Sequence, residues 1–191
     1  MKIGIYGGSF NPIHNGHILV AKYVLEKLKL DKLIIVPVGT PSHREIFQVE
    51  PEIRLKLVKS AFLNEKKVEI SDIEIFSKEK NYTYDTLLKI KDIYRGAEFY
   101  EIIGEDSAEN FTEWKEYKKI LELSKVVILR RKGHRNKLQG ENIIYLKSPY
   151  FQYSSTEIRE MIVHGEDISN CVPKDVKELI EKKNLYKEQG P

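Results

Sequence analysis

The stretch KIGIYGGSFNPIHNGH, residues 2–17, decides the fold. Its first part, Lys2–Tyr6, is an apolar run that predicts a buried strand, and a helical pattern begins at His17. The two glycines between them let the backbone adopt positive φ and approach an anion closely. The free amides and the dipole of the helix N-terminus attract negative charge. A strand, a glycine loop and a helix in this order predict an anion-binding site at the end of the first strand.

The rest of the chain alternates short β-rich runs with stretches of helical period. The predicted strands are Lys2–Tyr6, Lys32–Val38, Val68–Ile75, Glu98–Ile103, Lys125–Arg130 and Asn142–Leu146, and the predicted helices are His17–Leu28, Ile53–Leu63, Thr83–Tyr94, Thr112–Leu121, Ser155–Val163 and Lys174–Lys183. This alternation favours an α/β fold with a doubly wound, mostly parallel sheet and a C-terminal helical segment. We expect one domain over residues 1–191, with the helices at about 154–186 packed on it.

Composition limits the class of protein. The chain is 41% hydrophobic and 32% charged, which excludes a disordered protein, and 32 basic against 29 acidic residues give a net charge of only +3. So balanced a charge argues against a dedicated binder of nucleic acid or membranes and is compatible with a small anionic substrate. A single cysteine, Cys171, and the lack of a signal-peptide or membrane-spanning stretch predict a cytoplasmic protein. Oligomeric state stays open, a homo-oligomer included.

Two histidines stand at the predicted start of the first helix. His14 and His17 are three residues apart on either side of Gly16, so both imidazoles can direct N–H donors at one triphosphate. The bland alternative is a glycine turn with two surface histidines. The loop lacks the G-x-x-x-x-G-K-[ST] pattern, which excludes a P-loop NTPase.

A second candidate site is Tyr153-Ser154-Ser155-Thr156-Glu157-Ile158-Arg159, which opens a later helix. Ser154 and Glu157 have the spacing of a capping box, which would make the segment purely structural. The three hydroxyls and Arg159 can also form a second cradle for phosphate oxygens. From these residues alone both interpretations stay open.

Together, the two motifs resemble the nucleotidyltransferases with a His-x-Gly-His signature, and over residues 1 to about 186 the chain is similar to bacterial nicotinate-nucleotide adenylyltransferases. Further similar segments are Thr40-Pro41-Ser42-His43-Arg44, Arg54-Leu55, Tyr82-Thr83-Tyr84-Asp85-Thr86-Leu87 and Gly104-Glu105-Asp106 with Trp114. The resemblance implies a Rossmann-like nucleotidyltransferase fold. It also implies transfer of the adenylyl group of ATP to nicotinate mononucleotide, with release of pyrophosphate.

The resemblance also implies roles for single residues. His14, His17 and Arg159 would be catalytic; ATP would bind to Gly8, Ser9, Phe10, His14, Gly16, His17, Gly104, Asp106, Ser154, Ser155, Thr156 and Arg159; and nicotinate mononucleotide would bind to Asn11, Arg44, Thr83, Tyr84, Trp114 and Lys115. The acceptor's own 5′-phosphate would attack the α-phosphorus of ATP, so no protein nucleophile is needed. No carboxylate cluster is arranged as a metal cage, so Mg²⁺ would be held mainly by substrate phosphates.

Several of these residues have a structural alternative. Asp106 has the position of a helix N-cap, and Trp114 stands in a charged segment where a tryptophan is usually a partly buried core contact. Arg44 stands where the family has lysine, and it has the alternative of an exposed loop arginine. Ser9 and Asn11 replace the commoner Thr and Asp but keep a hydroxyl and a small turn-forming side chain.

Two other functions compete with the adenylyltransferase. Pantetheine-phosphate adenylyltransferases share the histidine and serine motifs but lack the Tyr82–Leu87 segment. A non-catalytic nucleotide-binding or RNA-binding module is the second alternative, because aminoacyl-tRNA synthetases carry a similar histidine motif. The chain has no anticodon-binding extension and no concentrated basic stretch, which disfavours the second alternative.

Overall fold

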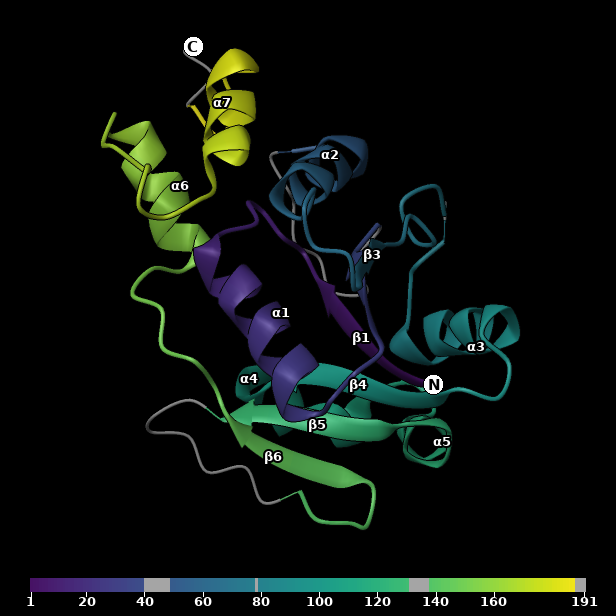
Figure 1. Cartoon of the computed structure of the whole chain (residues 1–191). Helices are drawn as coiled ribbons and strands as arrows, with labels where there is room; N and C mark the ends of the chain where they lie inside the picture. The colour runs from purple at the N-terminus through teal and green to yellow at the C-terminus, as the bar shows by residue number, and fades with distance from the viewer. Residues whose placement is uncertain (40–48, 78, 131–137, 188–191) are drawn as a thin grey trace.

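The computed structural model describes residues 1–39, 49–77, 79–130 and 138–187, and these form an all-parallel six-stranded sheet (Figure 1). The strands are β1 (Lys2–Gly8), β2 (Lys32–Pro37), β3 (Val68–Ile70), β4 (Glu98–Gly104), β5 (Lys125–Arg130) and β6 (Ile143–Lys147). They lie in the order β3-β2-β1-β4-β5-β6. The predicted α/β fold with a parallel sheet is confirmed.

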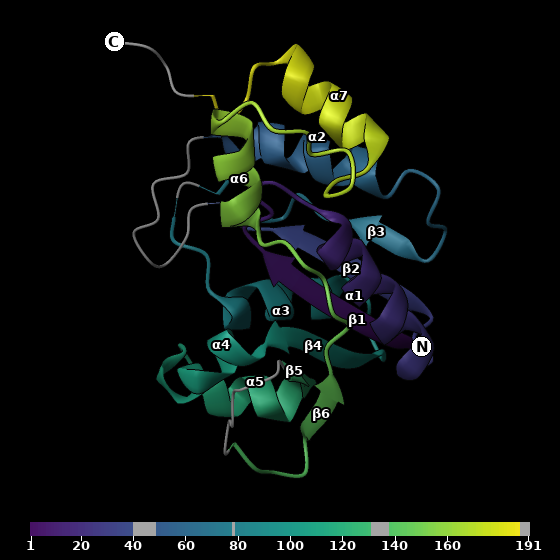
Figure 2. The same ribbon diagram turned by 90° about the vertical axis from the view of Figure 1, so that its left-hand side faces the viewer.

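Helices cover both faces of this sheet (Figures 1 and 2). They are α1 (Asn15–Lys27), α2 (Pro51–Ala61), α3 (Thr83–Ile93), α4 (Glu105–Glu109), α5 (Tyr117–Leu123), α6 (Ser155–Val163) and α7 (Lys174–Lys182). One apolar cluster unites the sheet with α1, α2, α6 and α7, and a second unites it with α3, α4 and α5. No helix in the described parts of the chain has the length and apolarity that crossing a membrane requires.

The strand order reverses direction between β1 and β4. From β1 the chain moves outward to β2 and β3 on one side, and it then returns to β4 and continues outward to β5 and β6 on the other side. The loops that leave β1 and β4 therefore diverge and open a crevice beyond the carboxyl ends of these strands, where ligands of such sheets bind.

Two predicted elements differ in the structure. The predicted helix Thr112–Leu121 is wrong at its start: the 3₁₀ turn η1 (Phe111–Glu113) ends at Trp114, whose backbone is extended. The chain then turns at Glu116, with φ of 55°, before α5 begins. The five-residue helix α4 was missed, because a single turn is too short to show a period.

The predicted strand Val68–Ile75 ends at Ile70. Beyond it the chain turns, with the Ile75 amide donating to the Asp72 carbonyl at 2.9 Å. The turn carries Glu74 inward, where its carboxylate accepts a hydrogen bond from the Thr86 hydroxyl at 2.6 Å. The contact of Glu74 with α3 therefore outweighs the β propensity of residues 71–75.

Candidate active site

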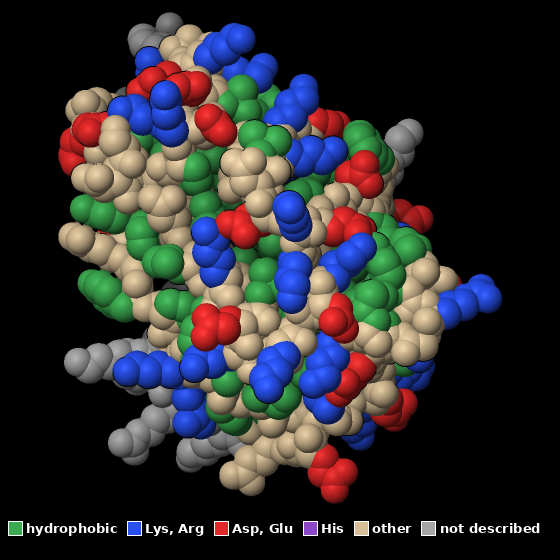
Figure 3. Space-filling view, in the orientation of Figure 1, with side chains coloured by type: hydrophobic (Ala, Val, Ile, Leu, Met, Phe, Trp, Pro, Cys, Tyr) green, Lys and Arg blue, Asp and Glu red, His purple; other side chains and the backbone are tan. Residues whose placement is uncertain are grey.

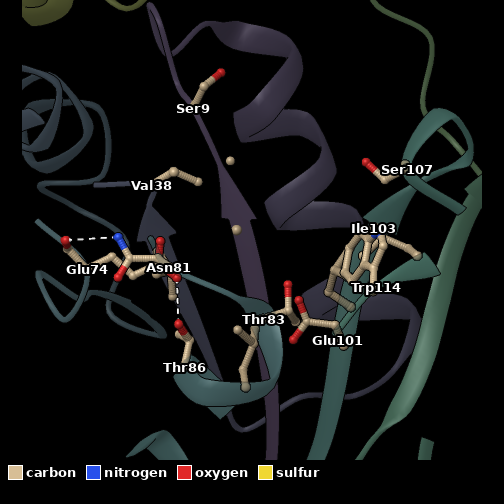
Figure 4. Close-up of a pocket in the computed structure, with 16 residues that line it drawn as sticks. Ser9, Val38, Glu74, Asn81, Thr83, Thr86, Glu101, Ile103, Ser107 and Trp114 are labelled. Atoms are coloured by element: carbon tan, nitrogen blue, oxygen red, sulfur yellow. Dashed lines mark hydrogen bonds between the residues drawn. The ribbon is translucent and has the colours of Figure 1, made fainter. Parts of the chain in front are cut away.

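A cavity of about 360 Å³ lies at the carboxyl ends of β1 and β4 (Figure 4). Its walls come from both strands, from the turn after β3, from the start of α3 and from the segment around η1. The lining residues are Ile5, Gly7, Gly8, Ser9, Val36, Val38, Glu74, Asn81, Thr83, Thr86, Glu101, Ile102, Ile103, Gly104, Ser107 and Trp114. This is the reversal point of the strand order, where a ligand is expected.

The two histidines are held by reciprocal hydrogen bonds at the start of α1. Nδ1 of His14 accepts from the Gly16 amide at 3.1 Å, and Nδ1 of His17 accepts from the His14 amide at 3.2 Å. The two residues thus form a capping box. A neutral imidazole that accepts at Nδ1 carries its proton on Nε2, so both rings have the tautomer that donates through Nε2.

Aromatic contacts fix the orientation of the two rings. The imidazoles lie 3.7 Å apart between centroids, and the ring of Phe151 stacks on His14 at 5.2 Å with an interplanar angle of 10°. The ring of Phe10 meets His17 edge-on at 5.0 Å. A Cβ at Gly16 would lie 2.7 Å from the Phe151 ring and 2.8 Å from the His14 ring, so glycine is required for this stack. Phe151 was missed from the sequence because it lies outside every recognised motif.

Arg54 anchors the loops around the cavity. It is wholly buried on α2, and its guanidinium donates to the carbonyls of Ser9 and Val38, each at 2.6 Å, and of Val49 at 3.3 Å. Burial lowers the pKa of Arg54. Its planar fork of donors suits several carbonyls at once. The sequence placed Arg54 at the start of a helix, but two of the carbonyls that it bonds, those of Ser9 and Val38, belong to distant loops.

Arg54→Lys is expected to lower the free energy of unfolding by about 1–3 kcal/mol, because a single ammonium leaves buried carbonyls without a donor. Urea unfolding with Arg95→Lys as the control, an exposed arginine, measures the difference. Equal stability of the two variants would contradict the anchoring role.

The start of α6 contacts the loop that follows β1. The Ser155 hydroxyl donates to the Pro12 carbonyl at 3.0 Å, and Nη1 of Arg159 donates to the Asn11 carbonyl at 2.7 Å. Ser154 forms a true capping box with Glu157, whose carboxylate accepts from the Ser154 amide at 2.7 Å. These bonds lower the pKa of Glu157. Ser154 is therefore the N-cap of α6, as the capping interpretation predicts. The same helix places Arg159 beside the loop that leads to the histidines.

Nη2 of Arg159 donates to Thr156 Oγ1 at 3.2 Å, so this hydroxyl is bonded within α6. The Asn11 side chain is buried, and among the described residues its Oδ1 has no hydrogen-bond partner. An unpaired buried amide oxygen requires an explanation, and a bound ligand is one.

Two residues expected to bind nicotinate mononucleotide, Thr83 and Trp114, line the cavity. Trp114 lines it and packs on Phe111 at 5.3 Å, so it is both a core contact and a cavity wall. Thr83 lines it as the first residue of α3, whose N-cap residue Tyr82 makes no side-chain capping bond. The first-turn amides of a helix have no intrahelical acceptor, so the start of α3 can receive a carboxylate.

Three other predicted residues, Tyr84, Lys115 and Asp106, are not among the residues that line the cavity. The Tyr84 side chain is outside the lining, with Lys119 5.6 Å from its ring. Lys115 is also outside the lining, in an ion pair with Asp85 at 2.7 Å. Asp106 is the second residue of α4, whose N-cap is Gly104, so it is not the cap itself. Arg44 and its loop lie outside the described residues.

Gly104 differs from Gly16, because a Cβ there would meet no protein atom within 4 Å. Since Gly104 lines the cavity, its lack of a side chain leaves room for a ligand. The described residues contain no group of three or more His, Cys, Asp or Glu side chains that could hold a metal.

Comparison with known proteins identifies the family. The cytidylyltransferase-like family model matches residues 5–161. A Fusobacterium nucleatum protein named as a probable nicotinate-nucleotide adenylyltransferase is 53% identical over 97% of this chain and 100% of its own length. A protein of the same name from Clostridium novyi is 38% identical over 97% of this chain and 99% of its own.

Among solved structures, the Plasmodium falciparum nicotinic acid mononucleotide adenylyltransferase complexed with NaAD superimposes with a TM-score of 0.75 and 23% identity, covering 97% of each chain. At this identity the likeness bears on the fold, which it confirms as a Rossmann-like nucleotidyltransferase fold with C-terminal helices. Because the family model spans most of the chain and the relatives match nearly all of it, the chain belongs to the nicotinate-nucleotide adenylyltransferases of the cytidylyltransferase-like superfamily.

Proposed function

We propose that the cavity and the adjoining histidines transfer the adenylyl group of ATP to the 5′-phosphate of nicotinate mononucleotide. A phosphate oxygen of the mononucleotide attacks the α-phosphorus of ATP, the bond from that phosphorus to the β-phosphate oxygen breaks, and deamido-NAD and pyrophosphate form. The observation that carries this proposal is the reciprocal capping of His14 and His17, which sets both rings to donate through Nε2 beside the cavity loop.

The phosphate chain of ATP would lie along the loop after β1 and the start of α1. There the histidines stabilise charge that grows on the phosphate oxygens during transfer, and fixed donors of this kind cost no reorganisation at the moment of reaction. Arg159 would hold the departing pyrophosphate from the start of α6. Gly104 leaves space for the nucleoside, and Asp106 would accept hydrogen bonds from the ribose.

The pyridine ring would lie against Trp114 with its carboxylate at the start of α3, received by Thr83 and the Tyr84 amide. Asn11, Arg44 and Lys115 would complete the mononucleotide site. Mg²⁺ would enter with ATP, since the described residues offer no cage for it. When bound, it would neutralise phosphate charge.

The surface is relevant to the RNA-binding alternative. On the face shown in Figure 3, Lys and Arg side chains alternate with Asp and Glu and do not gather in one basic area. A nucleic-acid site requires such an area. This face therefore gives no support to a nucleic-acid site.

An acceptor panel tests the proposed function. Pyrophosphate release from ATP and Mg²⁺ is measured with nicotinate mononucleotide, with phosphopantetheine and without an acceptor. We expect release with the first alone. Release with phosphopantetheine alone would establish the pantetheine-phosphate alternative, and no release with any acceptor would favour a non-catalytic nucleotide-binding module.

Arg159→Ala is expected to raise KM for ATP and to lower kcat, because the charge on pyrophosphate is present in both the ground state and the transition state. Glu157→Ala, the matched control, removes only the capping box and should lower the melting temperature by a few degrees at about 2–4 °C per kcal/mol of capping energy. Steady-state kinetics and thermal melts separate the two effects. Equal kinetic losses in both variants would mean that Arg159 only supports the helix.

A further inference from the structure

A buried carboxyl group without a partner lies in the cavity wall. Glu101 of β4 is 4% exposed, and among the described residues its Oε2 has no hydrogen-bond partner. The residues in register with it on the neighbouring strands are Ile5 and Val126, both apolar. Buried carboxylates are normally paired, so this group is an exception that needs a reason.

A second buried carboxyl group lies near it. Glu74 is 8% exposed, and its carboxylate accepts hydrogen bonds from the Thr86 hydroxyl at 2.6 Å and from the Gly39 amide. Burial, and then the charge of Glu74, raise the pKa of Glu101 well above its ordinary value. Burial raises the pKa of Glu74 too, but Glu74 has donors and Glu101 has none among the described residues. The negative charge is therefore held better on Glu74, and the neutral form is favoured at Glu101.

The other charged groups around Glu101 are few. Lys89 of α3 lowers the pKa of Glu74 through its positive charge. Asp85, also of α3, is in an exposed ion pair with Lys115. Strands β1 and β5 contribute apolar neighbours. Among the described residues that line the cavity there is no Lys, Arg or His. No basic side chain among the described lining residues therefore stabilises an ionised Glu101.

The carboxyl group of Glu101 lies in the part of the cavity to which we assign the pyridine ring, here called the ring slot. Figure 4 shows it between Thr83 and the Trp114 ring, and all three residues line the cavity. We propose that Glu101 determines acid-against-amide specificity: as a neutral carboxyl group it donates a hydrogen bond to the carboxylate of the pyridine substrate. This inference rests on the proposed function, since it concerns the same slot.

The protonation state of Glu101 then decides which substrate fits. A neutral carboxyl group donates its O–H to an anionic oxygen, and such charge-assisted bonds are strong. An ionised Glu101 only accepts, so it repels a pyridine carboxylate and can accept from the N–H₂ of a carboxamide. Preference for the acid should therefore be present at low pH and decline as pH rises through the pKa of Glu101.

The ratio of kcat/KM for nicotinate mononucleotide to that for nicotinamide mononucleotide, measured upward from neutral pH to the highest pH at which the protein stays folded, tests this inference. The ratio cancels pH effects on ATP and on the shared phosphate. In the wild type we expect this ratio to fall about tenfold or more as pH rises, because the charged hydrogen bond from Glu101 to the substrate carboxylate is lost. Glu101→Gln keeps a neutral donor that does not titrate, so its ratio should be flat. Glu98→Gln, on the exposed part of the same strand, is the matched control and should follow the wild type.

Glu101→Leu provides a second readout. It removes the donor, so kcat/KM for the acid should fall about tenfold or more, while the melting temperature should rise because an unpaired buried group is gone. In the unfolded chain Glu101 loses its proton near pH 4.3, whereas in the folded protein it keeps the proton to higher pH. Glu101 therefore lowers the free energy of unfolding increasingly as pH rises above that value. The rise in melting temperature of Glu101→Leu should grow with pH in the same way.

A flat ratio in the wild type, an equal fall in Glu101→Gln, or unchanged use of the acid by Glu101→Leu would overturn the inference. These outcomes differ from failure of the proposed function, in which neither mononucleotide gives a dinucleotide with any of the proteins.

Discussion

Replacing His17 with alanine is expected to lower kcat by about 10²–10³, the usual effect of removing one fixed donor to a reacting oxyanion. The reason is geometric: the hydrogen bond from the His14 amide to Nδ1 of His17 sets the ring to donate through Nε2. Single-turnover rates at saturating ATP and mononucleotide measure the transfer step itself. Retention of more than half the wild-type rate would show that His17 does not act on the phosphates.

His17 also stabilises α1, so the alanine variant must be compared with one that keeps the cap. Glutamine at the third helical position is a natural capping-box residue. His17→Gln should recover most of the melting temperature that His17→Ala loses, but not the rate. If glutamine restored both, the rate loss would come from the helix start and not from the imidazole.

Nicotinate mononucleotide is expected to exceed nicotinamide mononucleotide by about a hundredfold or more in kcat/KM at pH 7, the size of discrimination that unpaired polar groups produce. The start of α3 presents amides, and Thr83 adds a hydroxyl. A carboxylate accepts from such donors with both oxygens, whereas a carboxamide must turn N–H₂ toward one of them. Steady-state kinetics with both acceptors decides this, and equal efficiency would exclude an acid-specific slot.

Trp114 gives the same slot its stacking surface. Trp114→Ala should raise KM for the mononucleotide by about ten- to a hundredfold, since base stacking on an aromatic ring contributes about 1–3 kcal/mol. KM for ATP should change far less. Trp114→Phe keeps an aromatic face and serves as the control. If alanine left KM for the mononucleotide unchanged, Trp114 would be a core residue only.

The sequence was sufficient for the fold because most strands and helices carry a clear local pattern of apolar residues. Strand β2, for example, is a continuous apolar run, which is typical of a strand in a sheet that is covered on both faces. The sequence also predicted that His14, Gly16 and His17 lie together at the start of α1, because they stand within one helical turn. Local order therefore made these features predictable.

Long-range contacts were not predictable in the same way. Arg54 bonds to carbonyls that are 5, 16 and 45 residues away, and nothing near it in the sequence indicates those partners. Glu101 sits in an apolar strand where a carboxylate reads as an exposed position, and only the packing of the sheet shows that it is buried. The break at Trp114 likewise depends on how Phe111 packs in the core.

The central claim is that this chain joins the adenylyl group of ATP to nicotinate mononucleotide. ATP labelled at the α-phosphorus, incubated with Mg²⁺, nicotinate mononucleotide and the protein, tests it most directly. We expect the label to appear in deamido-NAD, with one pyrophosphate released for each dinucleotide formed. Label that stays in ATP, or that is recovered in AMP without a dinucleotide, would contradict it.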